Sequence, residues 1–200
     1  MLQLKRYPLF EENLDVLKNL SIDTSSLHEK QYVTESQLPA VNFDRVKDAY
    51  TRRLHISNEC ACSVDALLNI HGTPTFVEFK NGKVQSEQGN IKNKVRDSLL
   101  ILCDVTGKHI SYTRSSMDFI LVYNAIRNPM TPQEESMAKD ACGLQKPGGS
   151  LEYICQQISR LSKREFVRFN MEPLRGMYFK EVHTFTIDQF QKYLQRYNCY

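Results

Sequence analysis

The stretch CSVDALLNIHGTPTFVEFK, residues 62–80, decides the fold that the sequence predicts. It contains two runs rich in strand-forming residues, 62–70 and 73–80, separated by the dipeptide His71-Gly72. A residue followed by glycine between two such runs is typical of a two-residue β-hairpin loop. The sequence therefore predicts a hairpin with its turn at this dipeptide.

The hairpin register places the charged residues of the two strands. Pairing Ile70 with Thr73 and counting outward brings Asp65 opposite Glu78. Because side chains alternate between the two faces along a strand, Asp65, Glu78 and Lys80 share one face. The other face is mainly apolar and is the expected core side, with Val64, Ala66, Leu68, Thr75, Val77 and Phe79.

Two carboxylates that face each other across a hairpin repel, since their Cβ atoms lie about 5 Å apart. A divalent cation between them would turn this repulsion into a binding site, and Mg²⁺ binds a few carboxylate oxygens while keeping several waters. Asp65 and Glu78 are therefore the expected ligands of Mg²⁺ or Mn²⁺. The ammonium of Lys80 would hold a water or stabilise charge on a phosphate, which suits phosphodiester hydrolysis.

The spacing of these residues resembles a known signature. Asp65, a short spacer and then Glu78, Phe79 and Lys80 are similar to the motif of the PD-(D/E)XK nuclease superfamily. The resemblance covers about residues 42–124 and implies an α/β, restriction-endonuclease-like αβββαβ core. In that superfamily the first acid stands on one strand and the E-x-K motif on the next.

The same resemblance implies a contribution from the helix that follows the motif, often a Lys or Gln. An apolar stripe predicts a helix over residues 90–103, with Lys94 and Ser98 beside the stripe and facing the sheet. Lys94 is therefore the predicted helix residue of the site. The superfamily often has an acid on its first helix as well; Asp44 and Asp48 are available here, and the sequence places neither in the site.

The resemblance implies a metal-dependent nuclease that acts on DNA or RNA with Mg²⁺ or Mn²⁺. Asp65, Glu78, Lys80 and Lys94 would be its catalytic residues, and Asp65 and Glu78 its metal ligands. An alternative of another class is a catalytically inactive module that keeps the fold and binds nucleic acid or protein without metal, in a binding or regulatory role. Many such nucleases dimerise, so a homodimer is also left open.

The rest of the pattern predicts a single domain over residues 1–200, with helices added to the core and a C-terminal strand–helix extension over about 131–200. Expected elements outside the hairpin are helices at 8–20, 42–54, from 131 onward, at 150–163 and at 187–197, and strands at 118–124 and 177–183.

The charge, the apolar runs and the cysteines of the sequence indicate which partners and which cellular compartment to expect. The formal net charge of +3 falls within residues 151–200, which hold eight Lys or Arg and five Asp or Glu. This weak excess is compatible with a nucleic-acid partner without requiring one. No signal peptide is visible, and no apolar run approaches the roughly 18 residues that cross a bilayer. The six cysteines form no regular framework, so we expect reduced thiols in a soluble, cytoplasmic protein without a membrane partner.

Other chemistries are less favoured by the sequence. Four residues of the kinds that bind zinc lie close in the sequence: His55, Cys60, Cys62 and His71. No second cysteine pair follows them at the spacing of a zinc finger, so a zinc site is not favoured. A Cys nucleophile with a His base has no local support. The basic and aromatic residues within 163–180 are interpreted equally well as phosphate contacts or as a solvated face.

Overall fold

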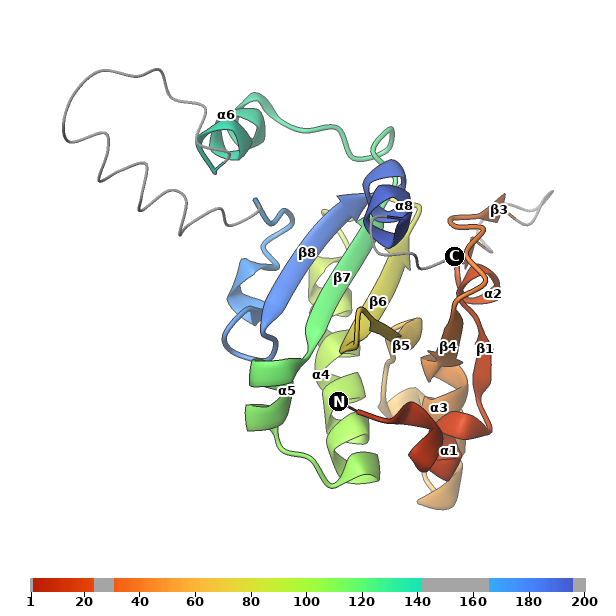
Figure 1. Ribbon diagram of the computed structural model, residues 1–200. Coiled ribbons are helices and arrows are strands. Elements are labelled where there is room, and N and C mark those ends of the chain that lie inside the picture. Colours follow the sequence, from red (N-terminus) through yellow and green to blue (C-terminus); the bar gives the residue numbers. More distant parts are fainter. Residues whose placement is uncertain (1, 24–30, 142–165, 196–200) are drawn as a thin grey trace.

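The computed structural model describes residues 2–23, 31–141 and 166–195 and has a mixed α/β architecture (Figure 1). Six strands form one sheet in the order β1-β4-β5-β6-β7-β8. Neighbouring strands from β1 to β6 are antiparallel, whereas β6, β7 and β8 are parallel. The strands of this sheet are β1 (Leu14–Val16), β4 (Pro39–Asn42), β5 (Ala66–Ile70), β6 (Thr73–Lys80), β7 (Asp118–Tyr123) and β8 (Glu181–Thr186). A separate pair is formed by β2 (Ile22–Asp23) and β3 (Gln31–Tyr32).

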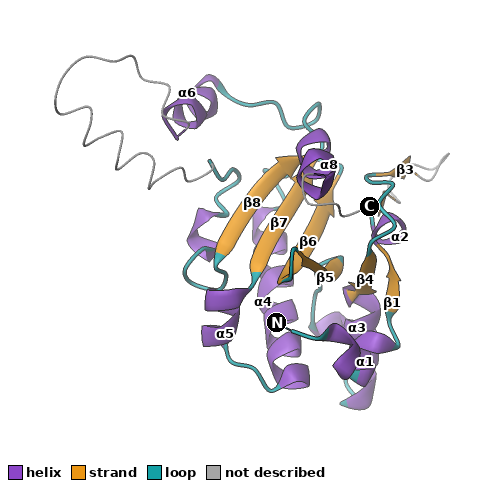
Figure 2. Cartoon of the chain, viewed as in Figure 1, coloured by secondary structure: helices purple, strands orange, loops and turns teal. Residues whose placement is uncertain are grey.

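Helices cover both faces of the main sheet (Figure 2). The α-helices of the described residues are α1 (Pro8–Glu11), α2 (Leu17–Leu20), α3 (Phe43–Arg53), α4 (Gln88–Thr106), α5 (Ile110–Ser116), α6 (Pro132–Ala141) and α8 (Ile187–Gln195). Short 3₁₀ helices occur at Leu4–Arg6, Asn58–Cys60 and Glu172–Leu174. Within these described helices, none is long and apolar enough to cross a membrane.

The predicted hairpin is confirmed. Strands β5 and β6 pair in the expected register, from Ala66 with Val77 to Ile70 with Thr73. The loop between them has φ of 52° at His71 and 81° at Gly72. Positive φ at both central residues is the geometry of the turn that follows the natural twist of two antiparallel strands.

The hairpin face of Ala66, Leu68 and Val77 is a core face, as predicted, but the charged face is a second core face. The face that carries Glu78 also carries Phe76 and packs against a core formed with α3 and α4, while the opposite face packs against α2 and α8. The reason is the strand that follows: β7 pairs in parallel with β6, and the connecting helix α4 must cross one face of the sheet. Glu78 is therefore buried, whereas the side chains of Asp65 and Lys80 are 19% and 20% exposed.

Val64 also differs from its predicted position. It belongs to the core of α3 and α4 and not to the face of Ala66. Strand β5 begins only at Ala66, so residues before it need not alternate between faces. The N–H of Val64 donates a 2.9 Å hydrogen bond to Ser98 Oγ on α4, which confirms that Ser98 faces the sheet.

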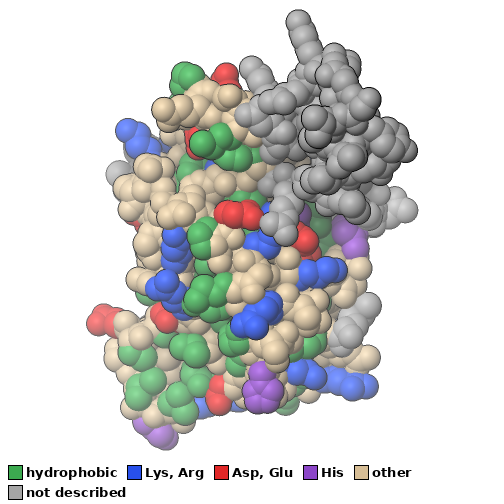
Figure 3. Space-filling model, turned by 90° about the vertical axis from the view of Figure 1, so that its left-hand side faces the viewer, with side chains coloured by type: hydrophobic (Ala, Val, Ile, Leu, Met, Phe, Trp, Pro, Cys, Tyr) green, Lys and Arg blue, Asp and Glu red, His purple; other side chains and the backbone are tan. Residues whose placement is uncertain are grey.

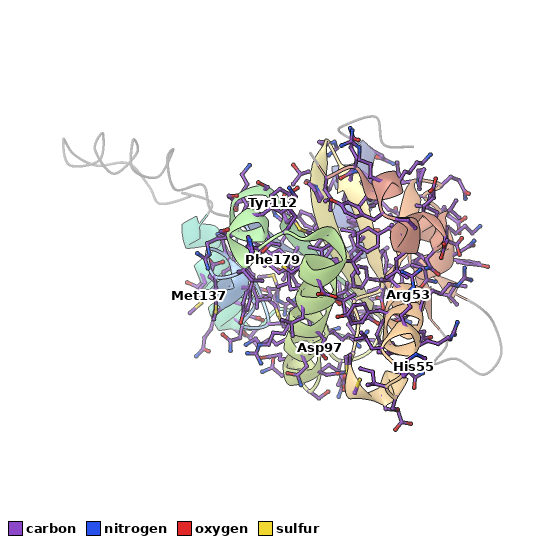
Figure 4. All side chains as sticks on the ribbon, turned by 90° about the horizontal axis from the view of Figure 1, so that it is seen from below. Arg53, His55, Asp97, Tyr112, Met137 and Phe179 are labelled. Atoms are coloured by element: carbon purple, nitrogen blue, oxygen red, sulfur yellow. The ribbon has the colours of Figure 1, made fainter. Side chains whose placement is uncertain are left out.

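The mixed α/β class is confirmed, but the αβββαβ order expected over residues 42–124 is not. Between α3 and α4 the chain forms two strands, whereas β4, which pairs antiparallel with β5, precedes α3. The segment from 54 to 60 between α3 and β5 is exposed and has a left-handed turn at His55, with φ of 57°. It therefore contributes no strand, while Asp97 on α4 accepts the N–H of Cys62 beyond it (Figure 4).

The helix predicted over residues 8–20 is wrong, and the strand predicted over residues 177–183 is confirmed in part. Residues 8–20 form two single-turn helices around β1, because Leu14–Val16 pairs with β4. The strand expected at 177–183 begins instead at Glu181 and joins the main sheet beside β7. The predicted helix at 150–163 lies outside the described residues.

A capping box begins both α6 and α8. At α6, Thr131 Oγ1 accepts the N–H of Glu134, and the Glu134 carboxylate accepts the N–H of Thr131. At α8, Thr186 and Gln189 exchange the same two hydrogen bonds. Such reciprocal bonds satisfy N–H groups that a helix start leaves without partners.

Candidate active site

A cleft of about 800 Å³ lies at the end of the hairpin away from its turn. Its walls come from the segment around α2 and β2, the start of α3, the loop after β6 and the first half of α4. Three of the four predicted site residues line it, and the fourth lies beneath. Its charged lining residues are Asp44, Asp65, Lys80, Lys83, Glu87 and Lys94.

Asp65 stands one residue before β5 and closes the end of the hairpin. Its Oδ2 accepts a 2.6 Å hydrogen bond from the N–H of Phe79, and its Oδ1 lies 3.5 Å from Lys94 Nζ. Burial raises the pKa of the Asp65 carboxyl, against the opposing effects of Lys94 and of the Phe79 N–H. The side chain is 19% exposed, so a ligand in the cleft can reach it.

Glu78 is fully buried and lies next to Asp65 beneath the cleft. Its Oε1 contacts two ammonium groups, Lys94 Nζ at 2.7 Å and Lys80 Nζ at 3.5 Å. Its Oε2 is buried and has no hydrogen-bond partner among the described residues. Burial raises the pKa of Glu78 to about 8, the Asp65 carboxylate adds to this rise, and Lys94 opposes it.

Lys94 reaches the two acids from the second turn of α4, as the sequence predicts. Burial would lower the pKa of its ammonium, but the carboxylates of Asp65 and Glu78 outweigh burial and raise the pKa above its usual value. Lys94 is thus held as a cation between the two acids. The structure brings together all four predicted residues of the site.

Lys80 approaches the same carboxylate from β6. Its Nζ lies 3.5 Å from Glu78 Oε1 and 4.0 Å from Glu87 Oε2, and its side chain is 20% exposed. It therefore touches both the buried acid and the open cleft. An ammonium in this position can contact an anion that enters from solvent.

Asp44 is the residue of the site that sequence reasoning missed. It lies in the first turn of α3, lines the cleft and accepts a hydrogen bond from the hydroxyl of Ser63. Its charge raises the pKa values of both Asp65 and Lys94, so it lies within electrostatic range of them. The available signal was the N-cap Asn42, which accepts the N–H of Arg45, fixes the start of the helix and so orients its first turn.

The loop between β6 and α4 is tied to the loop after β7. Asn128 Oδ1 accepts the N–H of Val84, and Asn128 Nδ2 donates to the carbonyl oxygens of Gly82 and Asn124. Asn124 in turn donates to Asn81 Oδ1 at 2.6 Å. These hydrogen bonds hold in place the loop between β6 and α4, which lines one side of the cleft.

The residues present fit a divalent cation in the kind of donor that they offer. Asp65 and Glu78 provide carboxylate oxygens, which Mg²⁺ and Mn²⁺ prefer, and one Glu78 oxygen has no other partner. However, the ammonium of Lys94 lies between the acids. In this arrangement the described residues contain no group of three or more His, Cys, Asp or Glu side chains able to hold a metal ion.

The less favoured alternatives gain no support from the described residues. His55, at the end of α3 (Figure 4), and Cys60 are exposed, whereas the His71 ring lies 5.6 Å from that of Tyr193. The described cysteines Cys60, Cys62 and Cys103 are free thiols.

The C-terminal basic segment is largely engaged within the protein in its described part. Arg168 is 5% exposed and bonds to Glu134, and Arg175 pairs with Glu172 and Glu181. On the face shown in Figure 3, the Lys and Arg side chains are scattered among neutral and apolar ones. Arg168 and Arg175 are therefore held in ion pairs within the protein.

Comparison of the chain with protein-family models, with curated proteins and with solved structures finds no match.

Proposed function

We propose that the chain is a metal-dependent nuclease of the PD-(D/E)XK type that hydrolyses phosphodiester bonds in DNA or RNA with Mg²⁺ or Mn²⁺. One observation carries the proposal: Asp65 and Glu78 meet beneath a cleft, with the ammonium groups of Lys80 and Lys94 each within 3.5 Å of Glu78 Oε1. Burying an acid such as Glu78 with an unpartnered oxygen costs free energy, which favours a functional role over a structural one.

The fold supports this reading. We infer that α3, β5, β6, α4 and β7 form a restriction-endonuclease-like core, with β4 as its third antiparallel strand. In such a core the first acid would stand at the end of one hairpin strand and the E-x-K motif at the end of the next, and Asp65 beside β5 and Glu78 to Lys80 on β6 support this inference. The parallel strand after the helix, β7, continues the same sheet.

The roles of the side chains follow from their positions. Asp65 and Glu78 would hold Mg²⁺ or Mn²⁺, which when bound supplies Lewis-acid polarisation of the phosphate and a water of lowered pKa. Lys80, which touches both Glu78 and the cleft, would orient the attacking water or neutralise charge on the phosphate. Lys94 would assist from α4. A cytoplasmic location belongs to the same proposal and agrees with the free thiols of the described cysteines.

A second candidate is favoured by one specific observation. Lys94 Nζ already lies 2.7 Å from Glu78 and 3.5 Å from Asp65, so the acids have a protein cation without any metal. A catalytically inactive module that binds nucleic acid or protein in a regulatory role would keep this arrangement permanently. Its binding would be unchanged by EDTA, and calorimetry would detect no uptake of Mg²⁺ or Mn²⁺.

Cleavage assays on purified protein test the proposal. Single- and double-stranded DNA and RNA are incubated with Mg²⁺, with Mn²⁺ and with EDTA. We expect cleavage of at least one substrate with metal and none with EDTA. Lys80→Ala is expected to reduce the rate by about 100-fold or more, as loss of a group that stabilises transition-state charge does.

Lys92→Ala is the matched control for these assays. Lys92 also lies on α4 but is not among the cleft-lining residues that the structure describes. Its loss is expected to leave cleavage unchanged. Metal-dependent cleavage that survives Lys80→Ala in a clean preparation would contradict the assignment, and binding without cleavage under all conditions would favour the inactive module.

A further inference from the structure

The two acids differ in their access to the cleft. Asp65 and Lys94 line it, whereas Glu78 is fully buried and is not a lining residue. The contact of Lys94 Nζ with Glu78 Oε1, at 2.7 Å, places the ammonium between Glu78 and Asp65. A cation that enters from the cleft therefore meets Asp65 directly but meets Glu78 only where Lys94 now lies.

We propose that Lys94 is the resident cation of this site, and that its ammonium must leave Glu78 before a metal ion can bind both acids. The inference rests on the proposed function and deepens it, since it makes Lys94 a positioning residue that sets the affinity for metal. In the metal-free protein the ammonium contacts both acids. In the metal-bound protein the same ammonium is released into the cleft, where a substrate phosphate would lie.

A metal ion bound to both acids and the Lys94 ammonium in its present position are too close to be present together. A metal ion bonded to carboxylate oxygens lies on the order of 2 Å from each of them. Lys94 Nζ lies 2.7 Å from one of those oxygens, so ion and ammonium would be within a few ångströms of each other. Like charges at such a separation repel strongly in a site of low solvent exposure, and one of them must move.

Lys94, and not Lys80, is the lysine that contacts both acids. Lys80 Nζ lies 3.5 Å from Glu78 Oε1 and is drawn on its other side towards Glu87, at 4.0 Å. Lys94 contacts both acids, and the charge of Asp44 also favours its ammonium form. The four-carbon stem of a lysine rotates freely, and Lys94 lines the cleft, so the ammonium has an exit path.

Titration calorimetry with Mn²⁺ alone tests the inference on the full chain. Lys94→Met and Lys94→Gln remove the charge, and we expect each to bind Mn²⁺ about tenfold more tightly than wild type, or more. Lys94→Arg restores a cation and is expected to return the affinity towards that of wild type. Lys92→Met, on the same helix, is expected to match wild type. Circular dichroism and urea midpoints establish that each variant is folded.

The outcomes separate this inference from the proposed function. If wild type binds Mn²⁺ and cleaves nucleic acid while folded Lys94→Met and Lys94→Gln bind no more tightly, the inference is overturned and the function stands. If both variants bind Mn²⁺ tightly but wild type cleaves nothing, the inference is upheld and the function is overturned. An equal gain in Mn²⁺ affinity in the Lys92→Met control would also overturn the inference, because the gain would then come from the lower net charge of the protein and not from the position of Lys94.

Discussion

The carboxylate of Asp65 accepts a 2.6 Å hydrogen bond from the backbone N–H of Phe79. One oxygen thus bonds to the neighbouring strand, while the other faces Lys94 in the cleft. The same side chain therefore contributes to the end of the hairpin and to the candidate site. Variants at this position should change stability as well as activity.

Asp65→Ala should lower the free energy of unfolding by about 1–3 kcal/mol, because the Phe79 N–H loses its acceptor. Asp65→Asn should cost less, since an amide oxygen can still accept this hydrogen bond. Both should abolish Mn²⁺ binding by removing the carboxylate. Urea unfolding monitored by circular dichroism measures the first effect; an Asp65→Ala midpoint equal to that of wild type would show that the bond contributes nothing.

Glu78 should make the metal-free protein less stable as the pH rises. Its pKa is about 8 in the folded protein, against an ordinary value of 4.5. Between these pH values the folded protein holds a proton that the unfolded chain has released, so the free energy of unfolding falls with rising pH. The loss is complete above about pH 8 and absent below about pH 4.5.

Glu78→Gln removes this proton and serves as the control. In EDTA, the stability of wild type should fall relative to Glu78→Gln between about pH 5 and pH 8, by at most about 1.4 kcal/mol per pH unit. Urea midpoints at several pH values give the comparison. Parallel curves for the two proteins would mean that the folded and unfolded proteins ionise Glu78 alike.

Asp44 should contribute to metal affinity through its negative charge at the rim of the site. Asp44→Asn is expected to weaken Mn²⁺ binding about tenfold and to slow cleavage, with a small effect on stability. Asp48→Asn is the matched control, because Asp48 lies on the same helix, pairs with Lys47 and is not among the described lining residues. Equal effects of the two changes would exclude a specific role for Asp44.

Arg168 should be among the most sensitive positions for stability outside the site. Its guanidinium bonds to both carboxylate oxygens of Glu134, to the Tyr123 hydroxyl and to the carbonyl oxygens of Asn128 and Pro129. Arg168→Ala should cost about 3 kcal/mol or more, because it leaves these acceptors unpaired. Arg168→Lys should recover little of this stability, since an ammonium lacks the planar, forked geometry of a guanidinium. Urea unfolding measures the stability of both variants against wild type. A loss below 1 kcal/mol in Arg168→Ala would contradict this account.

The hairpin could be predicted because its signals are local. The His71-Gly72 turn fixes the register of β5 and β6, which brings Asp65, one residue before β5, to the end of β6 that carries Glu78. The position of Lys94 was equally local, since the apolar stripe of α4 determines which side faces the sheet. These arguments need no knowledge of the rest of the fold.

Features that depend on distant partners could not be predicted. Leu14–Val16 forms a strand because β4 lies beside it, although its apolar spacing also suits a helix. The burial of Glu78 depends on α4 crossing that face of the sheet, and the role of Asp44 depends on where α3 begins relative to the hairpin. In each case a tertiary contact overrides or completes the local pattern.

The most direct test of the central claim is a crystal structure of the protein soaked in Mn²⁺, with anomalous data collected for the metal. The account predicts an anomalous peak on the order of 2 Å from carboxylate oxygens of both Asp65 and Glu78, with Lys94 Nζ moved away from Glu78. No peak at this position, with Lys94 still 2.7 Å from Glu78 Oε1, would contradict it.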